Sequence, residues 1–262
     1  MPRSLPTNRQ ADNLSRREFA CRLMGQTALA GLGALGLAKA INAADDDASG
    51  HRFDPILREI EGWTVHVDGS LLEGEHAEMG AEALKMLAGH LQRIRILIPS
   101  SALEKLQRME IWIERNHPQL HAMQYHPSER WLVDHGHDHR LAKKVHITQA
   151  KQLLSRDQLL KHPAVILHEL AHAYHDQVLG FEEPRIIAAY EAAKERGAYK
   201  EVLLYTGRKV EHYALTNHKE YFAEGTEAYF YRNDFYPFVR AELAEYDTTL
   251  HDLLGEVWGE KS

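Results

Sequence analysis

The chain has almost no cysteine: Cys21 is the only one among its 262 residues. A single thiol can form no disulfide within the chain and cannot supply the several thiolates of a cysteine-rich metal site. Cys21 also lies in the N-terminal segment, ahead of the motifs described below. We therefore expect any metal site or catalytic group to be built from histidine, carboxylate and hydroxyl side chains.

Positive charge is scarce relative to negative charge. The chain has 31 Lys and Arg residues against 38 Asp and Glu residues, for a formal net charge of -7 at pH 7. This balance would repel a phosphate backbone overall, so we expect no nucleic-acid partner. With 44% hydrophobic and 26% charged residues, the composition is typical of a soluble globular protein.

Apolar runs long enough to span a membrane are lacking too. The uncharged stretch near the N-terminus runs from Leu23 to Ala38, which is shorter than the ~20 residues of a spanning helix. Arg16 and Arg17 precede it, and small residues follow it. These are the three parts of a secretory signal, and the arginine pair resembles a twin-arginine signal. We interpret residues 1–43 as a twin-arginine-type signal peptide and spacer, with an N-terminal membrane anchor as the alternative.

A signal of this kind predicts a periplasmic or secreted protein with no stable membrane insertion after signal removal. Removing residues 1–40 leaves 25 basic and 36 acidic residues, a net charge of -11, and takes Cys21 away. We expect the exported domain to be acidic, free of cysteine and monomeric.

The order of periodic segments predicts one folded domain over residues 51–262. Alternating residues predict strands at 62–67, 109–114, 122–126 and 143–148, and helical spacing predicts helices at 75–98 and 101–108. After Gln149 the sequence reads as helices alone, at 149–156, 163–178, 183–196, 219–232, 238–245 and 250–258. Strands with one long helix, followed by helices, indicate the α+β class in two lobes, the first with a small mixed sheet and the second mainly helical.

The densest chemical motif is His-Glu-Leu-Ala-His, residues 168–172, within a largely apolar run. On a helix His168 and His172 project from the same face and can bind one ion. Glu169 is turned by about 100° from His168, so its carboxylate can reach a metal-bound water without displacing it. The alternative is a buried helix whose histidines are ordinary hydrogen-bonded core residues. A third ligand downstream would decide between the two.

Candidates for that ligand lie in the segment 216–230. Glu220, Glu224 and Glu227 recur at i, i+4 and i+7 and share one helix face. His218 points about 200° away from Glu220 and cannot share it. The third ligand is therefore expected to be a carboxylate, which suits a catalytic zinc ion with three protein ligands.

Both motifs resemble those of a known family. An HExxH motif followed by a helix with E-x-x-x-E resembles the gluzincin metallopeptidases, and YALTNHKEYFAE, residues 213–224, is similar to the matching segment of anthrax lethal factor-like catalytic domains. The resemblance is local, covering residues 164–176 and 213–230. It implies a zincin-like fold with the active-site helix in the N-terminal lobe, and it makes residues 121–127 the edge strand that binds substrate.

The resemblance also implies roles for single residues. His168, His172 and Glu220 become the ligands of one Zn²⁺ ion, and Glu169 becomes the general base. Tyr213, seven residues before Glu220, becomes the donor to the developing oxyanion. The remaining role falls to Glu224, whose carboxylate would fix the orientation of a ligand histidine.

Other polar residues admit two readings. The alternating histidines His135, His137 and His139 could bind a second metal ion, although a polar loop is the simpler interpretation. His175 and Asp176 either support a ligand from behind or form a solvated helix end.

The sequence predicts an exported zinc metallopeptidase that acts on a peptide or protein substrate. One alternative is a catalytically silent zinc-binding module of the same fold. The other is a metal-dependent hydrolase acting on a different amide, such as those of cell-wall peptides.

Overall fold

The computed structural model describes residues 50 and 52–259. The predicted signal, the arginine pair and Cys21 lie outside the described residues. Among the helices of the described part, none is both long enough and apolar enough to cross a membrane.

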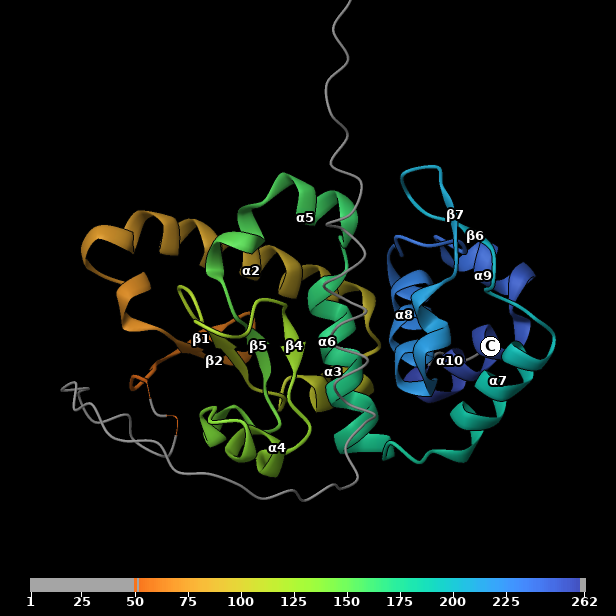
Figure 1. Ribbon diagram of the computed structural model, residues 1–262, viewed down its shortest axis with the longest axis horizontal. Helices are drawn as coiled ribbons and strands as arrows, with labels where there is room; N and C mark the ends of the chain where they lie inside the picture. The colour runs from red at the N-terminus through yellow and green to blue at the C-terminus, as the bar shows by residue number, and fades with distance from the viewer. Residues whose placement is uncertain (1–49, 51, 260–262) are drawn as a thin grey trace, which may run out of the picture. The chain divides into compact units, whose positions relative to one another are not determined.

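A mixed five-stranded sheet forms the first part of the fold (Figure 1). Its strands are β1 Ile56–Ile60, β2 Trp63–Val67, β3 Ile111–Ile113, β4 Gln124–Tyr125 and β5 Val145–Ile147. Their order is β1-β2-β3-β5-β4, with β2, β3 and β5 parallel and the two edge strands antiparallel to their neighbours. The predicted substrate strand, β4, is therefore an edge strand.

One face of this sheet holds the main core. Because side chains alternate along a strand, Val65, Ile111 and Val145 point to the same side, where all three are fully buried. They join a core cluster with Leu87 and Leu91 of helix α2 Ala77–Leu97. The helix ends where Ile98 turns to an extended conformation before Pro99, as its φ and ψ of -85° and 133° show.

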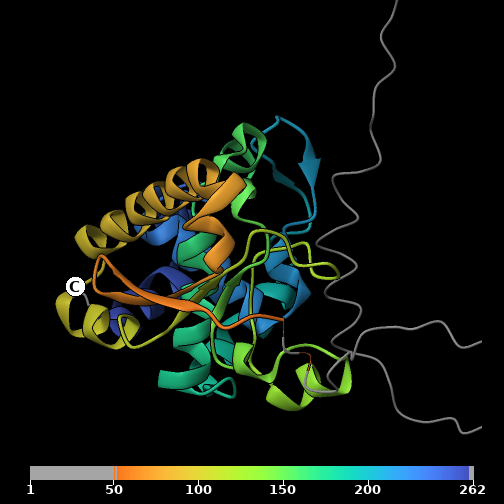
Figure 2. The ribbon, with the colours of Figure 1, turned by 90° about the vertical axis from the view of Figure 1, so that its left-hand side faces the viewer.

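The opposite face of the sheet carries two histidines with a tryptophan between them. His66, Trp112 and His146 form one cross-strand row in register. Leu132 of the short helix α4 Glu129–Asp134 and Leu141 pack there against Trp112. Figure 2 shows α2 along one side of the sheet and α4 along the other. The sheet is thus covered on both sides, by an apolar layer and by a layer rich in histidine.

The helices of the second part follow β5. They are α5 Arg156–Lys161, α6 Val165–Tyr174, α7 Pro184–Glu195, α8 His218–Phe230, α9 Arg240–Tyr246 and α10 Thr248–Trp258. The short helix α3 Ser100–Leu106 precedes β3. Helix α6 contacts β4 and β5 on one side and α8 on the other, so it lies between the sheet and the helices (Figure 1).

Helix α10 anchors α6 to α8. Trp258 is fully buried and stacks on Tyr174 of α6, with ring centroids 4.3 Å apart, and lies parallel to Phe222 of α8 at 5.9 Å. A Cβ at Gly225 of α8 would lie 2.6 Å from a methyl carbon of Leu250. The absence of a side chain at Gly225 is therefore what lets α10 approach α8 so closely.

The α+β class is confirmed, but several details differ from the sequence prediction, among them helices α4 and α5, which were not predicted. Strand β1 was not predicted, because its residues are mostly exposed and carry no clear alternation. Residues 202–203 and 209–210 form a small hairpin, β6 Val202–Leu203 and β7 Lys209–Val210, within the part expected to be helical. The helix expected at 149–156 is a 3-10 helix, η4 Ala150–Leu154. The helix expected to end at 178 changes at His175 into a π-helical turn, His175–Leu179.

Candidate metal centre

Helix α6 holds the His-Glu-Leu-Ala-His motif almost entirely out of water. Every residue from Val165 to Ala171 is buried, including His168 at 4% and Glu169 at 7% exposure. Such a helix cannot be stabilised by one apolar stripe alone, because its polar side chains must find partners inside the protein. Those partners come from α8 and β4.

Helix α8 places its glutamates opposite α6. Asn217 begins the helix, and its Oδ1 accepts hydrogen bonds from the backbone N–H groups of Lys219 and Glu220, at 2.9 and 3.0 Å. This cap satisfies two N–H groups that the helix itself cannot pair. It also fixes the backbone of Glu220 at the first turn.

The three predicted ligand residues converge. His168 Nε2 lies 3.1 Å from His172 Nε2, and each nitrogen lies 3.2 Å from Glu220 Oε2. A tetrahedral zinc ion with bonds of about 2.0–2.1 Å separates its ligand atoms by ~3.3–3.4 Å. The nearly equilateral triangle is therefore small enough for its three atoms to hold one metal ion.

The charge of the triangle suits a cation. Burial acts to raise the pKa of the Glu220 carboxyl, but the imidazoles of His172 and His168 outweigh it and hold that pKa well below its usual range. Glu220 is consequently ionised at neutral pH. Two imidazole nitrogens and one carboxylate are a donor set found in catalytic zinc sites.

Glu169 lies beside this triangle and is held by the edge strand. Its Oε2 accepts a hydrogen bond of 2.8 Å from the backbone N–H of Tyr125 in β4. Burial raises the pKa of the Glu169 carboxyl, against the opposing effect of His168 and His172. A carboxylate with a raised pKa is a better proton acceptor, as a general base requires.

A different glutamate from the expected one contacts the ligand histidine. Glu227 Oε1 accepts a hydrogen bond of 2.7 Å from His168 Nδ1, whereas Glu224 Oε1 lies 3.8 Å from that nitrogen. The helical rotation explains the difference: Glu227, at i+7, points about 20° from the direction of Glu220, and Glu224, at i+4, about 40°. The prediction that Glu224 orients a ligand histidine is corrected in favour of Glu227.

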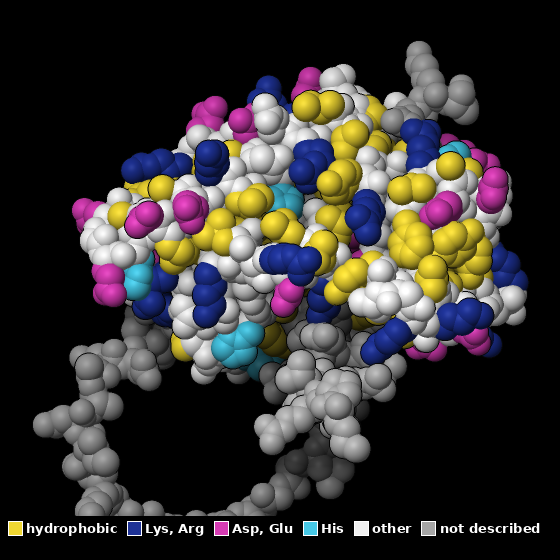
Figure 3. All heavy atoms as spheres, turned by 90° about the horizontal axis from the view of Figure 1, so that it is seen from above, with side chains coloured by type: hydrophobic (Ala, Val, Ile, Leu, Met, Phe, Trp, Pro, Cys, Tyr) yellow, Lys and Arg dark blue, Asp and Glu magenta, His cyan; other side chains and the backbone are white. Residues whose placement is uncertain are grey.

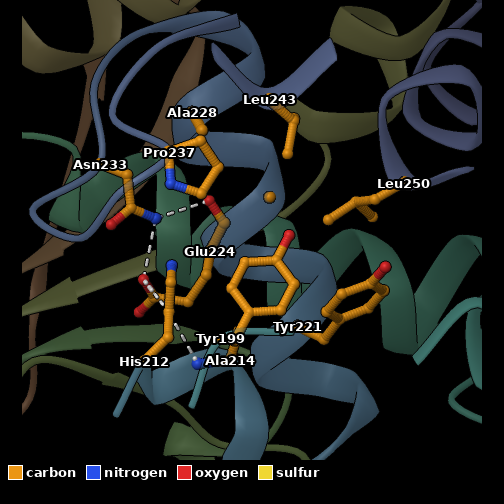
Figure 4. A pocket seen from close by; sticks show the side chains of 11 residues that line it. Tyr199, His212, Ala214, Tyr221, Glu224, Ala228, Asn233, Pro237, Leu243 and Leu250 are labelled. Carbon is orange, nitrogen blue, oxygen red and sulfur yellow. Dashed lines mark hydrogen bonds and ion pairs between the residues drawn. The ribbon is translucent and has the colours of Figure 1, made fainter. Parts of the chain in front are cut away.

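Glu224 instead lines a small pocket of mixed polar and apolar side chains at α8 (Figure 4). Its Oε2 accepts a hydrogen bond of 2.9 Å from Asn233 Nδ2, which also donates to the Glu224 backbone carbonyl. His212 Nδ1 lies 3.9 Å from the same Oε2. These contacts tie α8 to the chain segments that precede and follow it.

Tyr213 lies in the 3-10 turn Tyr213–Thr216 that leads directly into α8, and its side chain is half-buried. The turn is fixed on both sides. His212 Nδ1 accepts from the backbone N–H of Ala214 at 3.1 Å, and the Tyr190 hydroxyl donates to the Leu215 carbonyl at 3.0 Å. The role of Tyr213 towards an oxyanion stays a prediction.

His175 and Asp176, which follow the motif, contact different parts of the protein. Asp176 Oδ2 accepts hydrogen bonds from the Tyr125 hydroxyl at 2.6 Å and from Lys143 Nζ at 2.5 Å, so it joins the π-helical turn after α6 to the edge strand. The His175 ring is fully buried against Phe181 and Phe222. Burial lowers the pKa of His175 to about 3, so its ring is neutral.

The loop with alternating histidines shows no second metal centre. His135 and His139 are exposed, whereas His137 is buried next to His117, with ring centroids 5.5 Å apart. Within residues 50 and 52–259, the imidazoles and carboxylates that converge closely enough to hold an ion are confined to two sets, both of which include His168. The second set is His162, His168 and Glu227. His162 was not predicted from the sequence, since it lies outside helix α6 and has no periodic relation to the motif.

Comparisons with protein-family models, with curated proteins and with solved structures found no match to this chain. The geometry of the site therefore carries the functional argument alone.

Proposed function

We propose that this protein is an exported zinc-dependent metallopeptidase of the gluzincin type. The observation that carries the proposal is the triangle of His168 Nε2, His172 Nε2 and Glu220 Oε2, with sides of 3.1–3.2 Å. Its size and donor set fit a zinc ion with one open position. The buried carboxylate of Glu169 beside it suits a hydrolytic reaction better than a purely structural site, because structural zinc sites are closed by a fourth ligand.

The arrangement of elements is compatible with a zincin-like fold of two lobes. Helix α6 lies between the sheet and the helices that carry Glu220. Edge strand β4 contacts α6, and within the described residues its outer edge has no neighbouring strand. A peptide substrate in extended conformation could add to such an edge by backbone hydrogen bonds.

Each residue has a defined task in this reaction. A zinc ion bound by the triangle would supply a Lewis acid that polarises the scissile carbonyl and makes water acidic enough to lose a proton near pH 7. Glu169 accepts that proton and passes it to the leaving amine. The Tyr125 N–H keeps the Glu169 carboxylate aimed while it is deprotonated. Tyr213 donates a hydrogen bond to the oxyanion that develops on the carbonyl oxygen.

The proposal is tested with the purified protein and a library of peptides, assayed with and without a chelator. We expect cleavage that the chelator abolishes and added Zn²⁺ restores. Glu169→Gln should keep zinc and lose cleavage, because glutamine has nearly the same shape but cannot accept the proton. Zinc binding without any chelator-sensitive cleavage would favour a silent binding module, and activity only on cell-wall peptides would favour the other amide hydrolase.

A further inference from the structure

Glu227 receives two hydrogen bonds on a single oxygen atom, behind the ligand triangle. His168 Nδ1 lies 2.7 Å from Glu227 Oε1, and His162 Nε2 lies 2.8 Å from the same oxygen. The Glu227 side chain is fully buried, and the His162 side chain is 7% exposed. Water therefore contributes little to holding this carboxylate, whose direction depends on its two histidine neighbours.

The three groups are better described as a hydrogen-bonded chain than as a second metal site. Their separations of 2.7 and 2.8 Å are those of charge-assisted hydrogen bonds, and are shorter than the 3.1–3.2 Å sides of the ligand triangle. Both nitrogens also point to one oxygen, and Glu227 Oε2 has no hydrogen-bond partner within the described residues. An ion would instead draw the ligand atoms to distances of ~3.3 Å from one another.

The proton positions follow from this geometry. An ionised carboxylate only accepts, so both nitrogens facing Glu227 Oε1 must carry protons. For His168 this places the proton on Nδ1 and leaves the Nε2 lone pair facing His172 and Glu220. For His162 it places the proton on Nε2. One donor alone would leave the carboxylate free to rotate about its own axis.

His162 is itself held rigidly between two helices. It ends α5, where its backbone N–H donates to the Gln158 carbonyl at 2.8 Å. Its carbonyl accepts from the Val165 N–H at the start of α6, at 3.3 Å. The imidazole thus projects from a fixed junction towards α8.

From these contacts we propose that His162 is a positioning residue for zinc: it fixes Glu227, which fixes the ring of His168 as a ligand through Nε2. The inference rests on the proposed zinc site and goes beyond it. Partners behind a metal ligand commonly change metal affinity by 10- to 100-fold. His162 acts one step further away, so the lower end of that range is expected.

The first test measures Zn²⁺ affinity by competition with a chelator in the wild-type chain, His162→Leu and His162→Gln. Leucine fills space but cannot donate, whereas the glutamine amide can donate from near the position of Nε2. We expect a tenfold loss of affinity in His162→Leu, less than threefold in His162→Gln, and one zinc ion per chain in the wild type. The thermal midpoint of each metal-free variant shows whether a loss is merely structural.

Equal affinities in all three chains, or equal losses in both variants, would overturn the positioning role while leaving the proposed function intact. Two zinc ions per chain would overturn the hydrogen-bonded chain in favour of a second metal site. A wild-type chain that binds no zinc would overturn the proposed function itself.

The second test needs no variant and covers the case in which His162→Leu does not fold. Nitrogen chemical shifts of the histidine rings in the zinc-loaded wild-type protein report which nitrogen carries the proton. We expect His162 protonated on Nε2 and His168 on Nδ1. A His162 ring protonated on Nδ1 alone could not donate to Glu227, and the proposal would be wrong.

Discussion

At the scale of the residue, the candidate site depends on which atom each side chain offers. The family resemblance selected Glu220 as the third ligand, and the structure brings it to His168 and His172. The HExxH motif and the helical wheel indicated only that the two histidines share a face and that the third ligand is a carboxylate. They were not sufficient to choose between Glu224 and Glu227. The side chains of Glu224 and Glu227 differ in direction by only a few tens of degrees around α8. Which of them reaches His168 therefore depends on how α8 packs against α6. His162 carries no sequence signal at all.

At the residue scale, we predict that the Tyr213 hydroxyl is needed for catalysis but not for zinc binding. Tyr213→Phe removes one hydroxyl and leaves the ring, so zinc content should not change. Loss of one hydrogen bond to a developing oxyanion typically lowers kcat about 100-fold or more. Steady-state kinetics on a cleaved peptide, with zinc measured on the same sample, check this. A kcat within threefold of the wild type would remove Tyr213 from the reaction.

At the scale of the element, long periodic segments were predicted well and short exposed ones were not. The apolar spacing of α2 and α6 identifies both helices. Strand β1 and the β6–β7 hairpin are held by pairing with neighbours rather than by a buried face, so their own residues carry no alternation. The histidine layer on the sheet was also not predicted, because it joins residues from several separate segments.

That layer forms a polar chain across the sheet. His126 Nε2 lies 3.0 Å from His146 Nδ1, and His146 Nε2 lies 3.1 Å from Glu114 Oε1. Arg52 Nη1 donates to the other oxygen of Glu114 at 2.6 Å. His117 also packs against His146, at 5.5 Å between ring centroids. Burial lowers the pKa of His146 to about 3 and that of His126 well below its usual value, so both rings are neutral in the folded protein.

The free energy of unfolding should therefore fall in acid. The unfolded chain binds protons on these histidines near pH 6.5, whereas the folded chain does not until about pH 3 for His146. The contribution of these two histidines to the free energy of unfolding is complete above pH 6.5. It is lost as the pH falls, by up to about 1.4 kcal/mol per pH unit for each ring. Urea unfolding of metal-free protein between pH 8 and pH 5 measures this.

A variant isolates the contribution of the layer. His126→Leu should have a pH slope smaller than that of the wild-type chain by about one proton. The comparison of variant and wild type is needed because His168 changes the pH dependence of the free energy of unfolding in the opposite direction. Burial acts to lower the pKa of His168, but Glu220 and Glu227 raise it well above its usual value. A slope identical to that of the wild-type chain would mean that the layer is not neutral.

At the scale of the whole molecule, the sequence predicted the α+β class but not how its parts meet. Order along the chain and periodicity indicate which segments are strands or helices. Strand order and the contact of α6 with both β4 and α8 depend on side-chain fit between distant segments. On the face in Figure 3, basic side chains are interspersed with acidic and apolar ones.

Export is a property of the whole chain and rests on residues outside those described. Replacing Arg16 and Arg17 with lysine keeps the charge but removes the arginine pair, so a twin-arginine signal should fail and the protein should remain inside the cell. Cell fractionation with an antibody against the folded domain measures this. Unchanged export would indicate the general secretory route, and membrane retention of the uncleaved chain would indicate an anchor.

The most direct test of the central claim is the zinc content of three purified chains. We expect one zinc ion per chain in the wild type and in Glu224→Gln, because Glu224 belongs to the Asn233 pocket and not to the triangle. Glu220→Ala removes one of three ligands and should lose the ion. Full zinc occupancy in Glu220→Ala would contradict the assignment of His168, His172 and Glu220 as the metal site.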